Sequence, residues 1–310
     1  MSNPAFRLKN FDNLNQIPHS INLENNIAAF FDYACLLSSG YQNIYFNSID
    51  YAGNSVGTLK LAPSRQYASG KVWEGYRTNW AWENNSGINS VDISGIYINN
   101  VFTTSGFNVD YKHGQVIFDS PISTSSLVKC SFTSKNIFWD VSTSPWFREL
   151  TTETFKYSHF DANGIGSGIR NVLTNHRIQL PAVIVEVTTE NHFVPYMLGG
   201  GSFYNPRVNF YIFAENQQQK KLITDIICSQ NEGSFLGTNF EAVRQAGDFP
   251  YTNYGFLRSG AKEYPELQAN YPWNVKPITF EGLEGQNVPY VPGVYRSLVT
   301  GHCNLVLLVV

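Results

Sequence analysis

The segment PAVIVEVTTE, residues 181–190, is the first of two that decide the fold, because its β-branched residues favour a strand. A second strand is predicted by RVNFYIFAEN at 207–216, where apolar residues recur at every other position. The apolar residues on one face of this second strand are Val208, Phe210, Ile212 and Ala214. The loop 191–206 joins the two segments, and we expect the strands to pair antiparallel.

Two helices and a third strand are expected around this pair. The segment QQKKLITDIICSQ at 218–230 predicts a helix, since apolar residues recur in it at helical spacing. These apolar residues are Leu222, Ile223, Ile226 and Ile227. A second amphipathic helix is predicted over 20–38 by the same spacing, and 294–310 predicts a strand that joins the sheet of 181–214.

Residues 41–140 favour a separate β-rich module. Several short segments in it alternate or are rich in aromatic residues, and His113-Gly114 supplies a tight-turn signal between two of them. Short strands at this spacing are typical of a small sandwich or barrel. We therefore expect an α+β fold with three parts: an N-terminal arm at 1–19, an α/β unit of 20–40 and 141–310, and the inserted module at 41–140. Within the α/β unit, 229–293 is expected to be a long irregular stretch that a partner orders.

The composition narrows the classes of function. Charged residues make up 15% of the 310 residues, against roughly 25% in an average soluble protein, while 43% are hydrophobic and 15% aromatic. Lys and Arg number 21 and Asp and Glu 24, so the sequence lacks the basic surplus of nucleic-acid-binding proteins. The aromatic share and the net charge of -3 exclude a disordered chain. A β-rich globular protein with a neutral surface remains.

Targeting signals are not expected. The first twenty residues contain no apolar signal core, and no run approaches the roughly 18 apolar residues of a membrane span. The cysteines are far apart and form no CxxC pair, so we expect reduced, mostly buried thiols. They are Cys35, Cys130, Cys228 and Cys303. The protein is expected to be made in a cytosol and to have no association with a membrane.

Motifs of catalysis do not stand out, and the chain is not expected to be an enzyme. The sequence has no HExxH, GxSxG or P-loop motif, and GIGSGI at 164–169 follows a polar stretch rather than a strand, which favours a loop over a dinucleotide site. Scattered carboxylates are interpreted as solvated loop residues rather than a glycosidase pair. They are Glu74, Glu83, Asp119, Asp140 and Glu149. No catalytic residue, cofactor or metal is predicted.

The segment KVWEGYRTNWAWE at 71–83 carries the sharpest local feature, a cluster of Trp73, Trp80 and Trp82. Indole rings anchor subunit interfaces, fill cores and stack on the apolar faces of sugars. The cluster is interpreted first as core or a subunit or partner interface, with a sugar-stacking platform as the minority alternative.

A second candidate interface is LGGGSFYN at 198–205. Three consecutive glycines weaken a strand connection unless close approach or mobility is needed there. The segment is therefore interpreted as a flexible hairpin tip or as a loop that becomes ordered against a neighbouring subunit. Its candidate interface residues are Leu198, Gly199, Gly200, Gly201, Phe203 and Tyr204.

The sequence of residues 180–228 resembles that of the neck and tail-terminator proteins of tailed bacteriophages. Those proteins show a strand beginning Pro-Ala-x-x-Val-Glu, a Leu-Gly-Gly loop, a strand ending Phe-Ala-Glu and a helix with an apolar stripe. The matching residues are Pro181, Ala182, Val185, Glu186, Leu198, Gly199, Gly200, Phe213, Ala214 and Glu215. The segment VDYKHGQVIFDSPI at 109–122 also resembles a motif of phage tail and neck proteins, and the resemblance covers about a third of the chain.

This resemblance implies a terminator-like antiparallel or mixed sheet flanked by helices, in a structural virion protein. Such proteins form a ring, a hexamer as a rule, at the head-proximal end of the tail, where they terminate or stabilise the tail and join it to the head connector. The implied partners are other neck, tail-tube or sheath proteins, and DNA passes through the ring without specific binding. The implied location is the neck or tail of the virion, after synthesis in the host cytoplasm. The alternative is a carbohydrate-binding or adhesin-like component of a tail fibre or baseplate.

Overall fold

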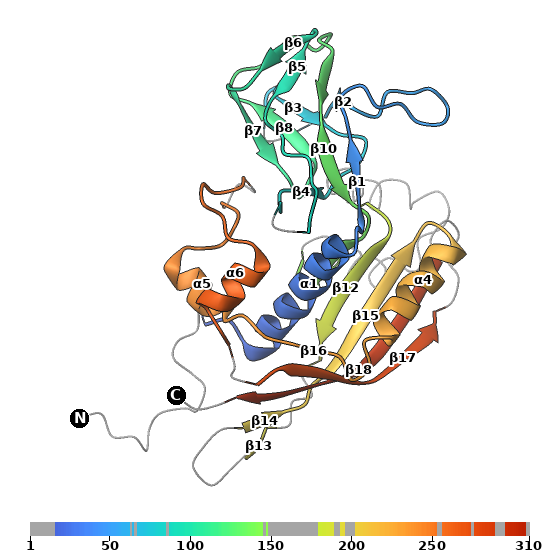
Figure 1. Cartoon of the computed structure of the whole chain (residues 1–310), viewed down its shortest axis with the longest axis vertical. Helices are drawn as coiled ribbons and strands as arrows, with labels where there is room; N and C mark the ends of the chain where they lie inside the picture. The colour runs from blue at the N-terminus through green and yellow to red at the C-terminus, as the bar shows by residue number, and fades with distance from the viewer. Residues whose placement is uncertain are drawn as a thin grey trace, which may run out of the picture.

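The computed structural model describes residues 16–62, 64, 67–84, 87–144, 147, 179–188, 193–195, 202–252, 256–273, 276–288 and 295–307. More of the described chain is strand than helix, the helices pack against the strands, and this mixture confirms the α+β prediction (Figure 1). Residues 1–15 of the predicted arm, the segment 164–169 and the glycine loop of Leu198 to Gly201 lie outside the described residues.

One mixed sheet contains the two strands predicted at 181–190 and 207–216. Its path is β11 (Phe138–Val141), β12 (Ala182–Val187), β15 (Arg207–Ala214), β18 (Tyr295–Leu307), β14 (Ser202–Tyr204) and β13 (Phe193–Pro195). Strand β17 (Ile278–Asn287) pairs with the other side of β18 and with β16 (Ser234–Phe235). The antiparallel pairing of β12 with β15 and the addition of the C-terminal strand β18 to this sheet are both confirmed.

Both predicted helices are present and pack on the same face of this sheet. Helix α1 (His19–Leu37) lies over β11 and β12, whereas α4 (Gln217–Cys228) lies over β15, β17 and β18. The Asn216 side chain caps α4 by accepting a hydrogen bond from the Gln219 amide at 2.9 Å. Phe31 of α1 stacks on Trp139 and meets Phe210 edge-on, so the apolar faces of helix and strands close one core.

The apolar stripe predicted for α4 is narrower than expected. Ile223 and Ile227 are buried in the core, while Leu222 is 58% exposed. The helix approaches the sheet closely at Gly285, where an added Cβ would come within 2.8 Å of the Thr224 side chain. The helix therefore buries one row of side chains, Ile223 and Ile227, against the sheet, and Leu222 lies on its exposed side.

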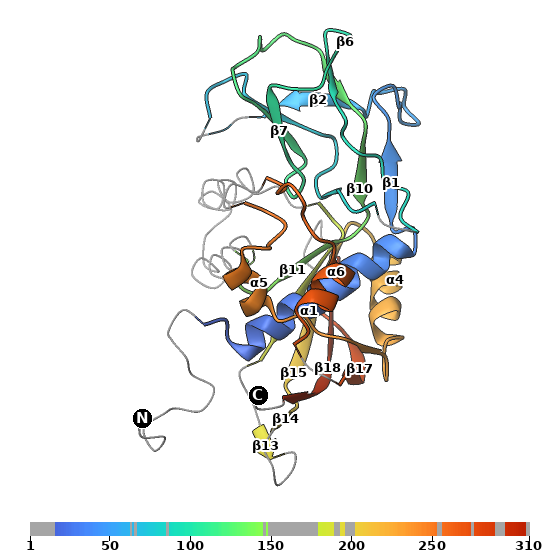
Figure 2. The same cartoon turned by 60° about the vertical axis from the view of Figure 1, so that its left-hand side comes forward.

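The prediction that 229–293 is irregular is wrong in large part. It contains β16, two short helices, α5 (Phe240–Ala246) and α6 (Tyr264–Asn270), and the ten-residue strand β17. The two helices lie beside α1 (Figure 2). Their attachment is polar: the Asn26 side chain donates to the Thr238 carbonyl and accepts from the Thr238 amide, and Asn22 accepts from the Phe240 amide.

Residues 41–135 form two further sheets with a core of their own. The first holds β1 (Tyr41–Ile44), β10 (Phe132–Lys135) and β4 (Trp80–Ala81). The second runs in the order β6 (Val101–Thr103), β5 (Ile96–Ile98), β9 (Val128–Cys130), β2 (Thr58–Leu61), β3 (Val72–Glu74), β8 (Gln115–Phe118) and β7 (Phe107–Asp110). The turn predicted at His113-Gly114 is confirmed between β7 and β8, with Gly114 at a φ of 63°. This region occupies one end of the long axis, beyond the C-terminal end of α1 (Figure 1).

Candidate functional site

The three predicted tryptophans have different surroundings. Trp73 and Trp80 are 3% and 1% exposed, in the core of the 41–135 region. Trp80 stacks on Phe132 at a ring distance of 4.4 Å, and its indole N–H donates to the Arg77 carbonyl. These two rings fill the core of this region, so the core alternative is confirmed for Trp73 and Trp80.

Trp82 is the member of the cluster that faces a hollow. It is half-buried, its ring meets Tyr251 edge-on, and its side chain hydrogen-bonds to that tyrosine. The hollow beside it has a volume of about 380 Å³ and is lined by polar and charged groups. They include Asp92, Arg258, Glu263 and Glu266. Trp82 is therefore the one aromatic of the cluster that a ligand can contact.

The described residues of the second candidate interface, LGGGSFYN, also differ in their burial. Tyr204 is fully buried in the sheet core, and burial raises the pKa of its hydroxyl well above the usual range. It is a core residue, which corrects its assignment to an interface. Phe203 is half-buried on β14, and Val194 is exposed on the neighbouring strand β13 at the end of the sheet.

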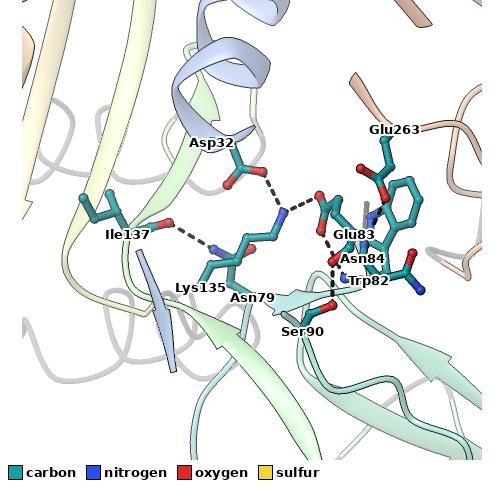
Figure 3. Close-up of polar contacts among 9 residues, drawn as sticks. All are labelled: Asp32, Asn79, Trp82, Glu83, Asn84, Ser90, Lys135, Ile137 and Glu263. Carbon is teal, nitrogen blue, oxygen red and sulfur yellow. Dashed lines mark hydrogen bonds and ion pairs between the residues drawn. The ribbon is translucent and has the colours of Figure 1, made fainter. Parts of the chain in front are cut away.

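The strongest constellation of charged groups lies where the 41–135 region meets α1. The ammonium of Lys135, at the end of β10, lies 2.7 Å from Oδ2 of Asp32 on α1 and 2.7 Å from Oε1 of Glu83, which follows β4 (Figure 3). The side chains of Lys135 and Glu83 are buried, and that of Asp32 is 25% exposed. We call these three residues the junction triad.

The junction triad combines burial with opposed charges. Burial, and the nearby charge of Glu83, raise the pKa of Asp32 above its usual value, although Lys135 acts in the opposite direction. The two carboxylates raise the pKa of Lys135 despite the desolvation of the ammonium. Burial also raises the pKa of Tyr251, whose hydroxyl lies in the field of the triad. One ammonium and two carboxylates cannot all be charged here without leaving a net buried negative charge, which is costly.

A layer of hydrogen bonds holds the triad in place. Oε2 of Glu83 accepts from the Trp82 amide at 3.0 Å, and the Glu83 carbonyl accepts from the Ser90 hydroxyl. Next along the chain, the Asn84 amide donates to Oε1 of Glu263 at 2.9 Å (Figure 3). The carboxylate of Glu83 therefore has a fixed position relative to the lysine ammonium.

A second buried carboxyl group lies further along α1. Glu24 is buried, and its oxygens accept from the Val187 amide at 2.9 Å and from the Ser142 hydroxyl. Burial raises the pKa of Glu24 to about 7, and the charge of Glu186 adds to the shift. Glu24 thus ties α1 to the ends of β11 and β12.

Neither buried acid on α1 was singled out in the sequence. On sequence alone Glu83, with four other carboxylates, is interpreted as a solvated loop residue. Asp32 and Lys135 belong to no recognisable sequence motif. The members of the triad are 52 and 103 residues from Lys135, and no local spacing connects them.

Within the described part of the chain, no three His, Cys, Asp or Glu side chains come together in a way that could hold a metal ion. No described helix is long and apolar enough to cross a membrane. The chain matches no family model. No curated protein matches it either.

Proposed function

We propose that the chain is a structural virion protein of a phage neck or tail. It forms a ring, expected to be a hexamer, at the head-proximal end of the tail, terminates or stabilises the tail and joins it to the head connector. The observation that carries the proposal is the packing of α1 and α4 on one face of the sheet built from β12, β15, β18 and β17. That arrangement agrees with the terminator-like sheet flanked by helices that the resemblance implies.

Ring formation also has a physical basis in the sheet. Strand β13 is the last described strand on this path of the sheet, and its exposed Val194 lies at an edge with which no other described strand pairs. A neighbouring copy that covers this edge makes a heterologous contact, and such a contact closes into a ring when its rotation does. The proposed subunit interface therefore includes β13, β14 and Phe203.

The partners follow from the same proposal. Other neck, tail-tube or sheath proteins contact the two faces of the ring. The net charge of -3 suits a channel that lets DNA pass without binding it specifically. A structural role of this kind requires neither a cofactor nor catalytic residues.

The test is the oligomeric state of the purified chain and of one pair of variants. Val194→Asp places a charge at the proposed interface, whereas Val101→Asp places the same charge on β6, an exposed edge strand of the other region. Light scattering and negative-stain microscopy should show rings for the wild type and for Val101→Asp, and smaller species for Val194→Asp. A strictly monomeric wild type that is absent from virions would overturn the proposal.

A second candidate is supported by the Trp82 hollow. A half-buried indole beside carboxylates and an arginine offers a stacking face and hydrogen-bonding groups to a sugar. On this alternative the chain is a carbohydrate-binding or adhesin-like component of a tail fibre or baseplate. Glycan titration followed by tryptophan fluorescence tests it with Trp82→Ala and, as a control, Tyr76→Ala, which removes an exposed aromatic outside the hollow. Binding that is lost in the first variant and kept in the second supports this candidate, and an unchanged signal in all three proteins rejects it.

A further inference from the structure

We propose that Lys135 and Asp32 become joined by an intramolecular isopeptide bond, with Glu83 as the base that accepts the proton of the amine. The proposal concerns the junction triad and does not depend on the ring. It assigns a covalent modification to a place where a buried ion pair alone would be expensive to maintain.

The geometry brings the reacting atoms together. Nζ of Lys135 lies 2.7 Å from Oδ2 of Asp32, and a carbon–oxygen bond is about 1.2 Å long, so Nζ is at most about 4 Å from Cγ. Figure 3 shows the amine between the two carboxyl groups, with each approaching it from a different element. Reactants held in this way behave as if at effective concentrations of about 10⁵ M or more.

The charges assign a role to each carboxyl group. The ammonium and one carboxylate form a neutral pair, so the second carboxyl group avoids a net buried charge only when it is protonated. Glu83 is the better place for the negative charge, because it accepts both the Trp82 amide and the lysine ammonium. Asp32, whose pKa is raised by burial and by Glu83, holds the proton. A neutral carboxylic acid is the form of Asp32 that an amine can attack.

The reaction then balances without another reagent. The carboxylates hold the proton on Nζ, whereas desolvation acts against the ammonium, so the reactive state is the minor one in which Glu83 has taken one proton from Nζ. The lone pair that this frees attacks Cγ of protonated Asp32. The C–O bond to the hydroxyl breaks, a second proton from Nζ leaves with it, and the product is an amide, one water molecule and protonated Glu83. The two charges of the ion pair are lost, and no oxidant or reductant takes part.

The surroundings favour the amide over the ion pair. Lys135 and Glu83 are buried, so little water competes with the amine, while the exposed quarter of Asp32 provides a route for the released water. The protonated Glu83 can donate to the new amide oxygen. The bond would close a covalent loop around residues 33–134, which include the whole 41–135 region except its last residue.

The test is the mass of the wild-type protein, which needs no variant to fold. The intact mass should be lower than the sequence mass by one water, and trypsin should fail to cut after Lys135 and yield a branched peptide that also contains Asp32. A wild type with the full sequence mass and normal cleavage after Lys135 would overturn the proposal.

Variants identify the chemistry. Glu83→Gln and Lys135→Arg should restore the full mass, and Lys262→Arg, which changes the partly exposed Lys262–Asp248 pair, should keep the deficit. Asp32→Asn should still react and lose one ammonia instead of one water, since an amide also yields an isopeptide bond. A deficit that persists in Lys135→Arg would assign the lost water to another site and contradict the proposal.

Discussion

Lys135 and Asp32 are 103 residues apart in the sequence, yet Nζ of the lysine lies 2.7 Å from Oδ2 of the aspartate. This contact joins the last strand of the 41–135 region to the helix that precedes it. Glu83, which follows β4, also pairs with this lysine. The side chain of Lys135 therefore connects three parts of the chain.

Replacing Lys135 by methionine should therefore lower the free energy of unfolding strongly. The change removes the cation, and with it the proposed bond to Asp32, and leaves two carboxyl groups at the junction without their partner. Breaking a buried pair in this way costs about 3–5 kcal/mol. Lys112→Met is the control, since Lys112 pairs with Asp140 at 3.4 Å with its own side chain half exposed, and such a pair contributes about 1 kcal/mol or less. Urea unfolding of both variants checks this, and equal losses would contradict it.

The attachment of α1 to the segment before α5 depends on Asn26. Its amide satisfies both the N–H and the C=O of Thr238, so Asn26→Ala should cost about 1–3 kcal/mol by leaving a buried backbone group without its partner. Asn25→Ala is the matched control on the same helix, because Asn25 is half-buried and donates to the Ile21 carbonyl one turn away. The control should lose less than about 0.5 kcal/mol, and thermal or urea unfolding that ranks the two in the opposite order would refute the assignment.

Stability should fall as the pH rises through the range in which Glu24 ionises. Its pKa in the folded chain is raised to about 7, above its usual value of 4.5, so between these values the folded state holds a proton that the unfolded state releases. The contribution is complete below pH 4.5 and is lost by about pH 7, and it amounts to about 3 kcal/mol. Glu24→Gln should remove this dependence when urea unfolding is compared at pH 5 and pH 8. The control Glu284→Gln changes an exposed carboxyl on β17 and should leave the dependence intact.

The turn between β7 and β8 should tolerate no side chain at Gly114. Its φ is 63°, and an added Cβ would come within 2.7 Å of the Arg77 carbonyl oxygen and the Thr78 Cα. Gly106 has a φ of 82°, but a Cβ there meets no described atom within 4 Å. Gly106→Ala should therefore cost about 1–2 kcal/mol for the backbone conformation alone, and Gly114→Ala clearly more. Calorimetry that gives the same loss for both would show that the turn can move aside.

Local periodicity predicted the elements that pack by one apolar face. The strands β12 and β15, the helices α1 and α4 and the strand β18 all have such a face, and each appears close to its expected bounds. Strand β17 was missed because ITFEGLEGQN carries exposed charges and two glycines in place of a regular alternation. Its register is determined by pairing with β18, a relation between distant segments that no local pattern contains.

The candidate site was harder to predict for a related reason. Asp32, Asn22 and Asn26 look like the polar side of a surface helix, but α1 is covered on that side by Lys135 and by the segment at Thr238. The tryptophans show the same limit, since the sequence left core and interface open for Trp80, and only the packing of Phe132 and the surrounding strands identifies it as a core residue. Burial is decided by what packs on top of a residue, and here the covering segments lie more than fifty residues away.

The chain passes into and out of the 41–135 region at one place, because Tyr41 of β1 and Lys135 of β10 are paired opposite each other. Because its two ends lie side by side, the whole region takes the place of a turn between α1 and the sheet that follows. The entropy cost of a longer connection grows only slowly with its length. A gene that acquires, exchanges or loses this unit leaves the path of the remaining strands unchanged. The architecture therefore allows this end of the molecule to diversify in evolution while α1 and its sheet stay the same.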